Sequence, residues 1–134
     1  MRITVNIKAA PKPKKLISIP QLKKKVQNAV NKYVRERDKD LPCISCGKWA
    51  DTWHAGHYWP QGSNGGLRYN LDNLHKQCVS CNLFKHGNQG EYRFGLIAKI
   101  GEKRVRWLED HRHELKKWKR DELEEIINST SEPL

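Results

Sequence analysis

Two cysteine pairs constrain the fold of this chain more than any other feature: Cys43 with Cys46, and Cys78 with Cys81. The cysteines of each pair are three positions apart, so both sulfurs can reach a single metal ion. Four thiolates complete a tetrahedral zinc shell with no open position, so the expected zinc is structural. Residues 47–77 lie between the pairs, a length that suits a hairpin inserted between two metal-binding loops.

Length and charge restrict the class of protein. The chain has 134 residues, enough for one domain with a modest core. Its formal net charge of +11 indicates a polyanionic partner, most simply nucleic acid. We find neither an apolar run of membrane-spanning length nor a signal-peptide core, so we expect a cytoplasmic protein with no membrane partner. In that reducing compartment, paired cysteines are typical of metal ligands rather than disulfides.

A helix is expected before the first cysteine pair. Ser18 and Pro20 are helix-start signals, and the helical spacing of apolar residues continues to about Arg37. The apolar stripe consists of Leu22, Val26, Val30, Tyr33 and Val34. Such an amphipathic helix needs a partner that covers its apolar face. Residues 2–8 alternate polar and apolar side chains, a pattern that fits either a short strand or a loose arm.

The segment between the pairs predicts a hairpin followed by a short helix. Alternation over residues 52–58 indicates a strand, and residues 63–66 carry the turn signal Ser-Asn-Gly-Gly. We expect the return strand to begin at residues 67–71. A short helix should then begin at the second cysteine pair and end near Gly87.

Two or three further helices are expected beyond the second pair, from apolar residues within 92–100, 105–108 and 121–127. We place Trp53 and Trp107 in the core. The fold class is therefore α+β. The expected organisation is a basic N-terminal arm and linker over residues 1–19, a single domain over 20–110, and a basic helical tail over 111–134.

The zinc site leaves most of the histidines without a role. Four of the six lie within residues 43–86, and a shell closed by four thiolates uses none of them. Hydrolysis of a phosphodiester at neutral pH needs a base for the attacking water and a cation for the charge on the leaving oxygen. Histidine suits the first role because its pKa lies near the operating pH, and a divalent cation with few protein ligands suits the second.

The motifs of this stretch resemble those of a known nuclease family. The chain contains, in order, Cys-x-x-Cys, Gly-His-x-x-Pro, Gly-Gly, Asn-Leu and Cys-x-x-Cys-Asn-x-x-Lys. This pattern is similar to the HNH, or ββα-metal, nuclease family in its four-cysteine zinc form. Within that family, residues 39–101 closely resemble the phage NinG (Rap) recombination endonucleases, through Asp-Leu-Pro-Cys-Ile-Ser-Cys-Gly, Leu-Arg-Tyr-Asn and His-Lys-Gln-Cys. The resemblance implies an HNH module stapled by zinc and flanked by helices.

The resemblance also implies roles for individual residues. His57 matches the general base at the end of the first strand, and Asn73 matches the asparagine that braces the loop aiming this base. Asn82, directly after the last cysteine, matches the ligand of a catalytic Mg²⁺ or Mn²⁺. Lys85 matches a basic residue close to the scissile phosphate.

One position departs from the HNH pattern. Many members carry an aspartate directly before the base, where this chain has Gly56. NinG-like chains instead have an aspartate three residues before the base, where this chain has His54. In a strand, His54 and Gly56 share a face, so His54 is the candidate for the substitute ligand, and His86 and Asp51 are weaker candidates for completing the shell. Imidazole is a softer ligand than carboxylate and shifts metal preference away from Mg²⁺.

The activity implied by the resemblance is metal-dependent hydrolysis of branched DNA, such as Holliday junctions and D-loops, in phage recombination. Resolution of a junction needs two opposed nicks, which favours a symmetric homodimer. One alternative is an HNH nickase, or a homing or restriction-type endonuclease, that cuts ordinary duplex DNA. A second alternative is a zinc-binding nucleic-acid adaptor without catalysis, for which Gly56 is the main argument.

Basic residues throughout the chain are candidates for phosphate contacts. Such contacts make binding strongly dependent on salt and position a branched DNA by shape rather than by base sequence. The candidate nucleic-acid-binding residues are Lys23, Lys24, Arg68, Lys85, Arg93, Lys103, Arg104 and Arg106.

Overall fold

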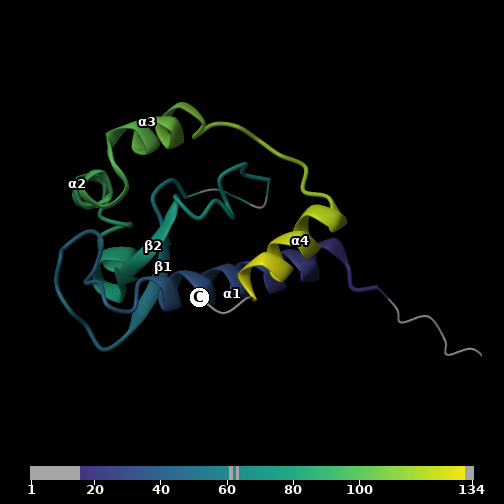
Figure 1. Ribbon diagram of the computed structural model, residues 1–134, viewed down its shortest axis with the longest axis horizontal. Coiled ribbons are helices and arrows are strands. Elements are labelled where there is room, and N and C mark those ends of the chain that lie inside the picture. The colour runs from purple at the N-terminus through teal and green to yellow at the C-terminus, as the bar shows by residue number, and fades with distance from the viewer. Residues whose placement is uncertain (1–15, 61, 63, 132–134) are drawn as a thin grey trace, which may run out of the picture.

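The computed structural model describes residues 16–60, 62 and 64–131, and over these ranges the chain forms four α-helices, a short π-helix and a two-stranded antiparallel sheet. This confirms the predicted α+β class. The elements are α1 (Ile19–Arg37), β1 (Trp53–His57), β2 (Leu74–Cys78), the π-helix η1 (Ser80–Phe84), α2 (Gln89–Ile100), α3 (Glu102–Asp110) and α4 (Arg120–Thr130) (Figure 1). The strand or arm expected over residues 2–8 lies outside the described residues.

Helix α1 begins and ends close to the predicted positions. The Ser18 hydroxyl accepts the amide of Gln21, whose side chain accepts the Ser18 amide in return, and this reciprocal pair caps the helix. The side chains of Leu22, Val26, Val30 and Val34 recur every four residues and are buried. They pack on the hairpin and on α4, together with Ala55, Leu74 and Leu123.

The hairpin lies between α1 and α2 (Figure 1). Its register pairs Trp53 with Cys78 and His57 with Leu74. Because side chains alternate along a strand, Ala55 and His57 lie on one face while His54 and Gly56 lie on the other. The first face packs against α1 through Ala55, and the backbone of the second is contacted by α2.

The return strand begins later than expected. Residues 67–71 form turns, and the strand starts at Leu74, so the prediction of a return over 67–71 was wrong. The Asn70 side chain accepts the amide of Asp72 at 2.9 Å, and the backbone oxygen of Asn70 accepts the amide of Asn73 at 2.9 Å. These local bonds hold the backbone in a turn and compete with strand pairing.

Helices α2 and α3 form a second core cluster with the segment that follows β1. The cluster contains Tyr58, Leu67, Tyr92, Leu96, Val105 and Leu108. The hydroxyl of Tyr92 donates to the backbone oxygen of Gly56 at 2.7 Å, which fixes α2 on the hairpin. Trp107, placed in the core by our prediction, is instead 48% exposed and stacks on His111. That prediction was wrong because Val105 and Leu108 already fill the buried face of α3.

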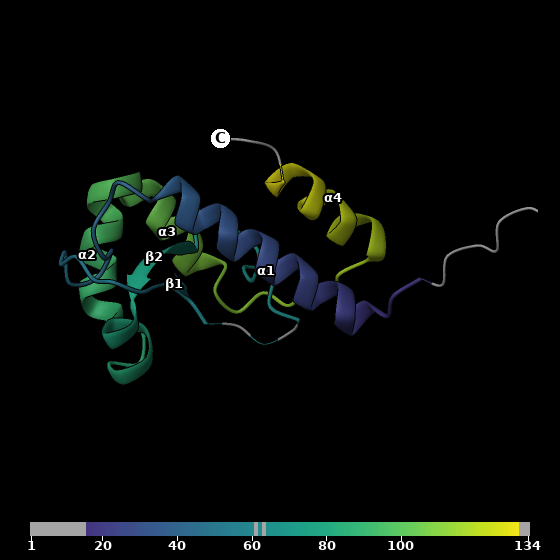
Figure 2. The same ribbon diagram turned by 90° about the horizontal axis from the view of Figure 1, so that it is seen from below.

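Helix α4 lies along α1 (Figures 1 and 2). Residues 111–134, predicted to be a helical tail, thus include a helix that adds the buried Leu123 to the α1 core. The segment leading to α4 also bonds the loop before β2, where Lys116 donates its amide to Asn64 and the Trp118 indole donates to Gly65. None of the helices in the described ranges has the length and apolar character needed to cross a membrane.

Helix α2 approaches the first cysteine loop closely at Gly95. A Cβ at this position would lie 2.0 Å from the backbone oxygen of Ile44. We therefore expect Gly95→Ala to lower the free energy of unfolding by about 1–3 kcal/mol, because the overlap forces α2 away from the loop. Urea unfolding measures the change. Gly90→Ala in the same helix meets open space, so this control should be neutral or stabilising by about 0.5–1 kcal/mol. Equal losses in both variants would contradict the contact.

Candidate metal centre and active site

The sulfurs of Cys43, Cys46, Cys78 and Cys81 form one cluster, within 4.8 Å of one another. The Cys46 and Cys78 sulfurs are 3.8 Å apart. Zinc–sulfur bonds of about 2.3 Å in a tetrahedron place neighbouring sulfurs about 3.8 Å apart, so the cluster has the dimensions of a zinc site. Four thiolates suit a soft divalent ion, and these residues can hold a metal such as zinc.

Neighbouring donors support the sulfurs. The Cys78 amide donates to the Cys43 sulfur and the Cys81 amide to the Cys78 sulfur, both at 3.4 Å. The Asn88 side chain donates to the Cys81 sulfur at 3.5 Å. Such donors stabilise thiolate charge and orient the ligands. Asn88 reaches this position because it adopts a left-handed backbone with φ 46°, as does Gly87 with φ 84°.

His57 ends β1, and a backbone carbonyl holds its ring. Its Nε2 lies 2.9 Å from the oxygen of Arg68. A carbonyl only accepts, so Nε2 carries the proton and Nδ1 keeps a free lone pair. Burial lowers the pKa of His57 below its ordinary value, and the Arg68 charge lowers it further, against the opposite effect of the hydrogen bond. The ring is therefore neutral at pH 7 and can accept a proton at Nδ1.

Asn73 is fully buried and ties the segment after His57 to the loop before β2. Its side-chain oxygen accepts the Trp59 amide at 2.9 Å. Its side-chain nitrogen donates to the backbone oxygens of Trp59 and Leu67, at 3.1 and 3.2 Å. These bonds hold the backbone after His57 against the loop that contains Leu67.

His54 and Asn82 meet between β1 and η1. The Asn82 side-chain nitrogen lies 2.8 Å from the His54 Nδ1. Two ligands of an octahedral ion at about 2.1 Å lie about 3 Å apart, so this separation fits two ligands of one cation once the Asn82 amide turns its oxygen inward. His57 lies on the opposite face of β1 from this pair, and among the described residues no hydrogen bond joins the two groups.

The glycine before His57 has a structural cause. A Cβ at Gly56 would lie 2.0 Å from the side-chain oxygen of Gln77, which is fully buried. A carboxylate at this position would therefore displace Gln77 from its place between the hairpin and the loop at Gly87. His54, two residues earlier on the same face, is free of this overlap.

Comparison with known proteins places the chain in a family. A family model described as Bacteriophage Lambda NinG protein matches residues 6–133. The chain belongs to the NinG family. It is 46% identical over 104 residues to Protein ninG of Escherichia phage lambda, a match covering 77% of this chain and 50% of that relative. It is 42% identical over 120 residues to Protein ninG of Salmonella phage P22, covering 81% of this chain and 59% of that relative.

The chain spans between 50% and 60% of the length of these NinG relatives and of Protein ninG of Escherichia phage 933W, with which it is 42% identical. No solved structure matches it. The family match extends over the cysteine cluster, the hairpin and the flanking helices, because residues 6–133 include all of the described residues.

The candidate DNA-binding residues of this NinG chain differ in their surroundings. Arg93 pairs with Glu109, Arg104 with Asp72 and Arg106 with Glu102, so each already contacts a carboxylate. Lys23 donates to the Asn64 side chain at 3.4 Å, and the Arg68 guanidinium lies over the Tyr69 ring. Lys24, Lys85 and Lys103 are exposed, and none of them forms an ion pair with a described residue. Lys85 directly follows η1, the element that contains Asn82.

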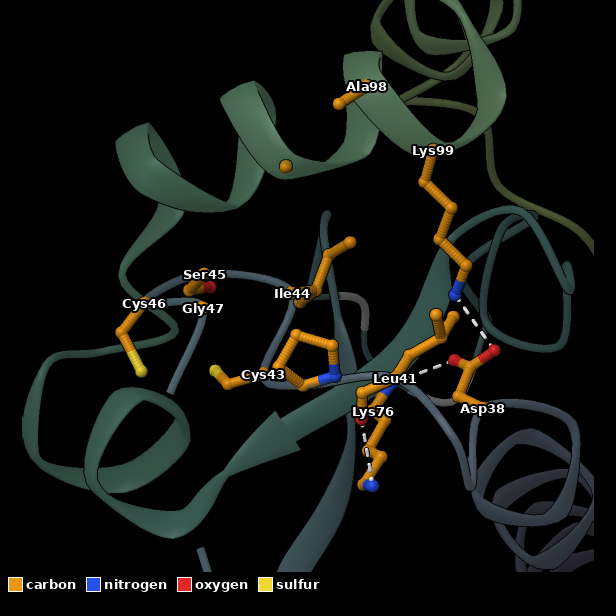
Figure 3. A pocket seen from close by; sticks show the side chains of 12 residues that line it. Asp38, Leu41, Cys43, Ile44, Ser45, Cys46, Gly47, Lys76, Ala98 and Lys99 are labelled. Atoms are coloured by element: carbon orange, nitrogen blue, oxygen red, sulfur yellow. Dashed lines mark hydrogen bonds and ion pairs between the residues drawn. The ribbon is translucent and has the colours of Figure 1, made fainter. Parts of the chain in front are cut away.

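Asp38 anchors a buried polar network that the sequence did not reveal (Figure 3). Its carboxylate is 1% exposed and accepts the Lys99 ammonium and the Arg37 guanidinium, both at 2.8 Å, and the Lys76 amide at 3.1 Å. These bonds join α1, β2 and α2 beside a cavity of about 470 Å³ that reaches the first cysteine loop. Against the effect of burial, the bonded Arg37 and Lys99 hold the pKa of Asp38 far below its usual value. The Asp-Lys pairing of distant elements has no local sequence signal.

His75 belongs to the same network and not to the cysteine cluster. Its Nε2 donates to the backbone oxygen of Asp72 at 2.8 Å, while its Nδ1 accepts from Lys99 at 2.7 Å. Burial and the nearby charges of Lys99 and Arg37 lower the pKa of His75 to about 3. The folded protein therefore keeps this imidazole neutral.

We expect the stability of the protein to fall as the pH falls from 6.5 towards 3. The unfolded chain protonates His75 near pH 6.5, whereas the folded chain resists until about pH 3, so unfolding takes up a proton in this window. Between pH 7.5 and 5.5 the loss from His75 is about 1 kcal/mol. Urea unfolding of zinc-saturated protein at these two pH values measures it. His75→Gln should lose about that much less, and an unchanged pH slope in this variant would contradict the assignment.

Proposed function

We propose that this NinG chain is a metal-dependent HNH-type endodeoxyribonuclease, a phosphodiester hydrolase acting on branched DNA such as Holliday junctions and D-loops in phage recombination. The observation that carries the proposal is that one hairpin, next to the cysteine cluster, carries a neutral, oriented histidine and a contacting pair of potential cation ligands. Those groups are His57 and the pair His54 with Asn82. The motif resemblance of residues 39–101 to the HNH nucleases points the same way.

His57 is suited to remove the proton of the attacking water. The carbonyl of Arg68 holds the Nε2 proton and leaves Nδ1 as the acceptor. The lowered pKa of His57 keeps Nδ1 unprotonated at pH 7. Asn73 ties Trp59, two residues after His57, to Leu67, the neighbour of Arg68, so its role is positioning rather than contact with the substrate.

His54 and Asn82 offer a nitrogen and an amide oxygen to a divalent cation. A bound Mg²⁺ or Mn²⁺ would neutralise charge on the phosphate and on the leaving oxygen. The exposed Lys85 follows η1, the element that carries Asn82, and adds positive charge to this part of the chain. His54 and His57 lie on opposite faces of β1, so the scissile phosphate would have to lie at the outer edge of β1, which is not paired in the described residues.

Positive surface on several elements supports a polyanionic substrate. Exposed cations lie on α1, after η1 and on α3, represented by Lys24, Lys85 and Lys103. Of these elements, α1 and α3 lie on different sides of the hairpin (Figure 1), so a straight duplex would contact fewer of the cations than a branched DNA would. A homodimer would present two such sites to the opposed strands of a junction.

The test of substrate choice is a panel of labelled four-way junction, D-loop, flap and linear duplex of equal length. We expect the zinc-loaded protein, in Mg²⁺ or Mn²⁺, to nick the branched substrates at least about tenfold faster than the duplex. Equal rates would favour the alternative of a duplex nickase or a homing or restriction-type endonuclease. Tight binding of the junction with no nicking in any metal would favour the zinc-binding adaptor.

A further inference from the structure

Gln77 is fully buried, and its side-chain oxygen accepts no hydrogen bond from any described residue. An unsatisfied buried acceptor costs about 1–3 kcal/mol, so such an atom calls for an explanation. The residue lies on β2 directly before Cys78.

The direction of this oxygen is fixed by the other end of the amide. The Gln77 side-chain nitrogen lies 2.6 Å from the backbone oxygen of Gly87 and 2.8 Å from the hydroxyl of Ser45. A backbone oxygen only accepts, so the group facing Gly87 must be the donor. The Gln77 oxygen is thereby turned towards Gly56, where a Cβ would lie 2.0 Å from it. The missing side chain of Gly56 leaves the space that this oxygen occupies.

The orphan oxygen lies on the same face of the hairpin as the cation site. Gln77 is the cross-strand partner of His54, and directly opposed side chains have Cβ atoms about 4.5–5.5 Å apart. His54 in turn contacts Asn82 at 2.8 Å. The pair His54 and Asn82 and the residue Gln77 thus come from β1, η1 and β2, with Gln77 directly opposite His54 in the hairpin.

We propose that the side-chain oxygen of Gln77 is a third protein ligand of the divalent cation held by His54 and Asn82, an inference that rests on the proposed function. A cation would satisfy the orphan oxygen, which itself lies in the space left by the missing side chain of Gly56. Because imidazole and two amides carry no charge, the ion keeps its full positive charge for a phosphate. A mixed nitrogen and oxygen set without carboxylate favours Mn²⁺ over Mg²⁺.

A titration of the zinc-loaded protein with Mn²⁺ tests the proposal without reference to cleavage. The electron paramagnetic resonance signal of free Mn²⁺ reports how much of the ion is bound. We expect one Mn²⁺ site in the wild type. Gln77→Met keeps the length of the side chain but lacks the oxygen, and should weaken Mn²⁺ binding at least about tenfold. Ser45→Ala removes one partner of the Gln77 nitrogen and leaves the oxygen in place, so this control should bind Mn²⁺ as the wild type does.

A second variant separates ligation from folding. Gly56→Asp combined with Gln77→Ala moves an oxygen ligand to the neighbouring strand and empties the space that a carboxylate needs. We expect this double variant to bind Mn²⁺ at least as tightly as the wild type. Two results would overturn the inference: wild-type affinity for Mn²⁺ in folded Gln77→Met, or weak Mn²⁺ binding by the folded double variant. If the wild type still cleaves DNA, the proposed function stands. A wild type that neither binds Mn²⁺ nor cleaves DNA would overturn the proposed function as well.

Discussion

Removal of zinc is expected to unfold this domain. Structural zinc contributes roughly 10–16 kcal/mol of binding free energy in small domains, whereas a domain of this size is stable by only about 5–15 kcal/mol. Cys43, Cys78 and Cys81 form their own buried cluster, packed by Trp53, between the hairpin and the loop before it. Without the metal, nothing would join the two cysteine pairs, because this cluster is separate from the two apolar clusters of the core. Thermal melting monitored by circular dichroism, with and without a zinc chelator, measures the effect. We expect the cooperative transition to be lost when the chelator is present.

Single substitutions refine this expectation. Cys78→Ser should bind less than one zinc per chain and lose most of the thermal stability. Ser80→Ala alters an exposed residue between Cys78 and Cys81 and should leave both zinc content and melting unchanged. An identical melting curve for the Cys78→Ser protein would rule out a metal centre that holds the hairpin.

Replacement of His57 by alanine is expected to lower the rate of DNA cleavage by about 10²–10⁴-fold, the usual contribution of a well-placed general base. Binding of a four-way junction should persist, since His57 lies at the end of β1 and the exposed cations lie elsewhere. Single-turnover cleavage and a mobility-shift titration measure the two quantities separately. His113→Ala, an exposed histidine before α4, is the control and should cleave at the wild-type rate.

The pH profile gives an independent view of His57. Because burial lowers the pKa of His57 below its ordinary value, the acidic limb of kcat/KM should lie below pH 6.5. The limb should disappear in the residual activity of His57→Ala. Equal cleavage by the His57→Ala protein and the wild type would remove this residue from the mechanism.

Sequence patterns predicted the elements whose cause is local. The four-residue recurrence of Leu22, Val26 and Val30 and the cap at Ser18 predicted α1 almost to the residue, because spacing and capping act within one helix. The three-residue spacing within each cysteine pair likewise predicted that the four sulfurs lie together, because each pair can bind the same ion through one short loop.

Contacts between distant elements were the part that the sequence did not reveal. In the sequence, Asp38 is only a residue at the end of a helix. In the structure its carboxylate forms an ion pair with Lys99 on α2, which is far away along the chain. The turn at Asn70 delayed the return strand through a side-chain bond that an alternating pattern does not show. Gln77 gave no signal either, because the space it fills exists only when β1 and β2 are paired.

The proposed activity is tested most directly by strand cleavage of a labelled four-way junction with zinc-loaded protein in Mg²⁺ or Mn²⁺, resolved on a denaturing gel. We expect metal-dependent nicks close to the branch point, at least about tenfold faster than nicks in a linear duplex of the same sequence. Absence of nicks in both metals, with the junction bound and the protein folded, would contradict the proposal that this chain is a nuclease.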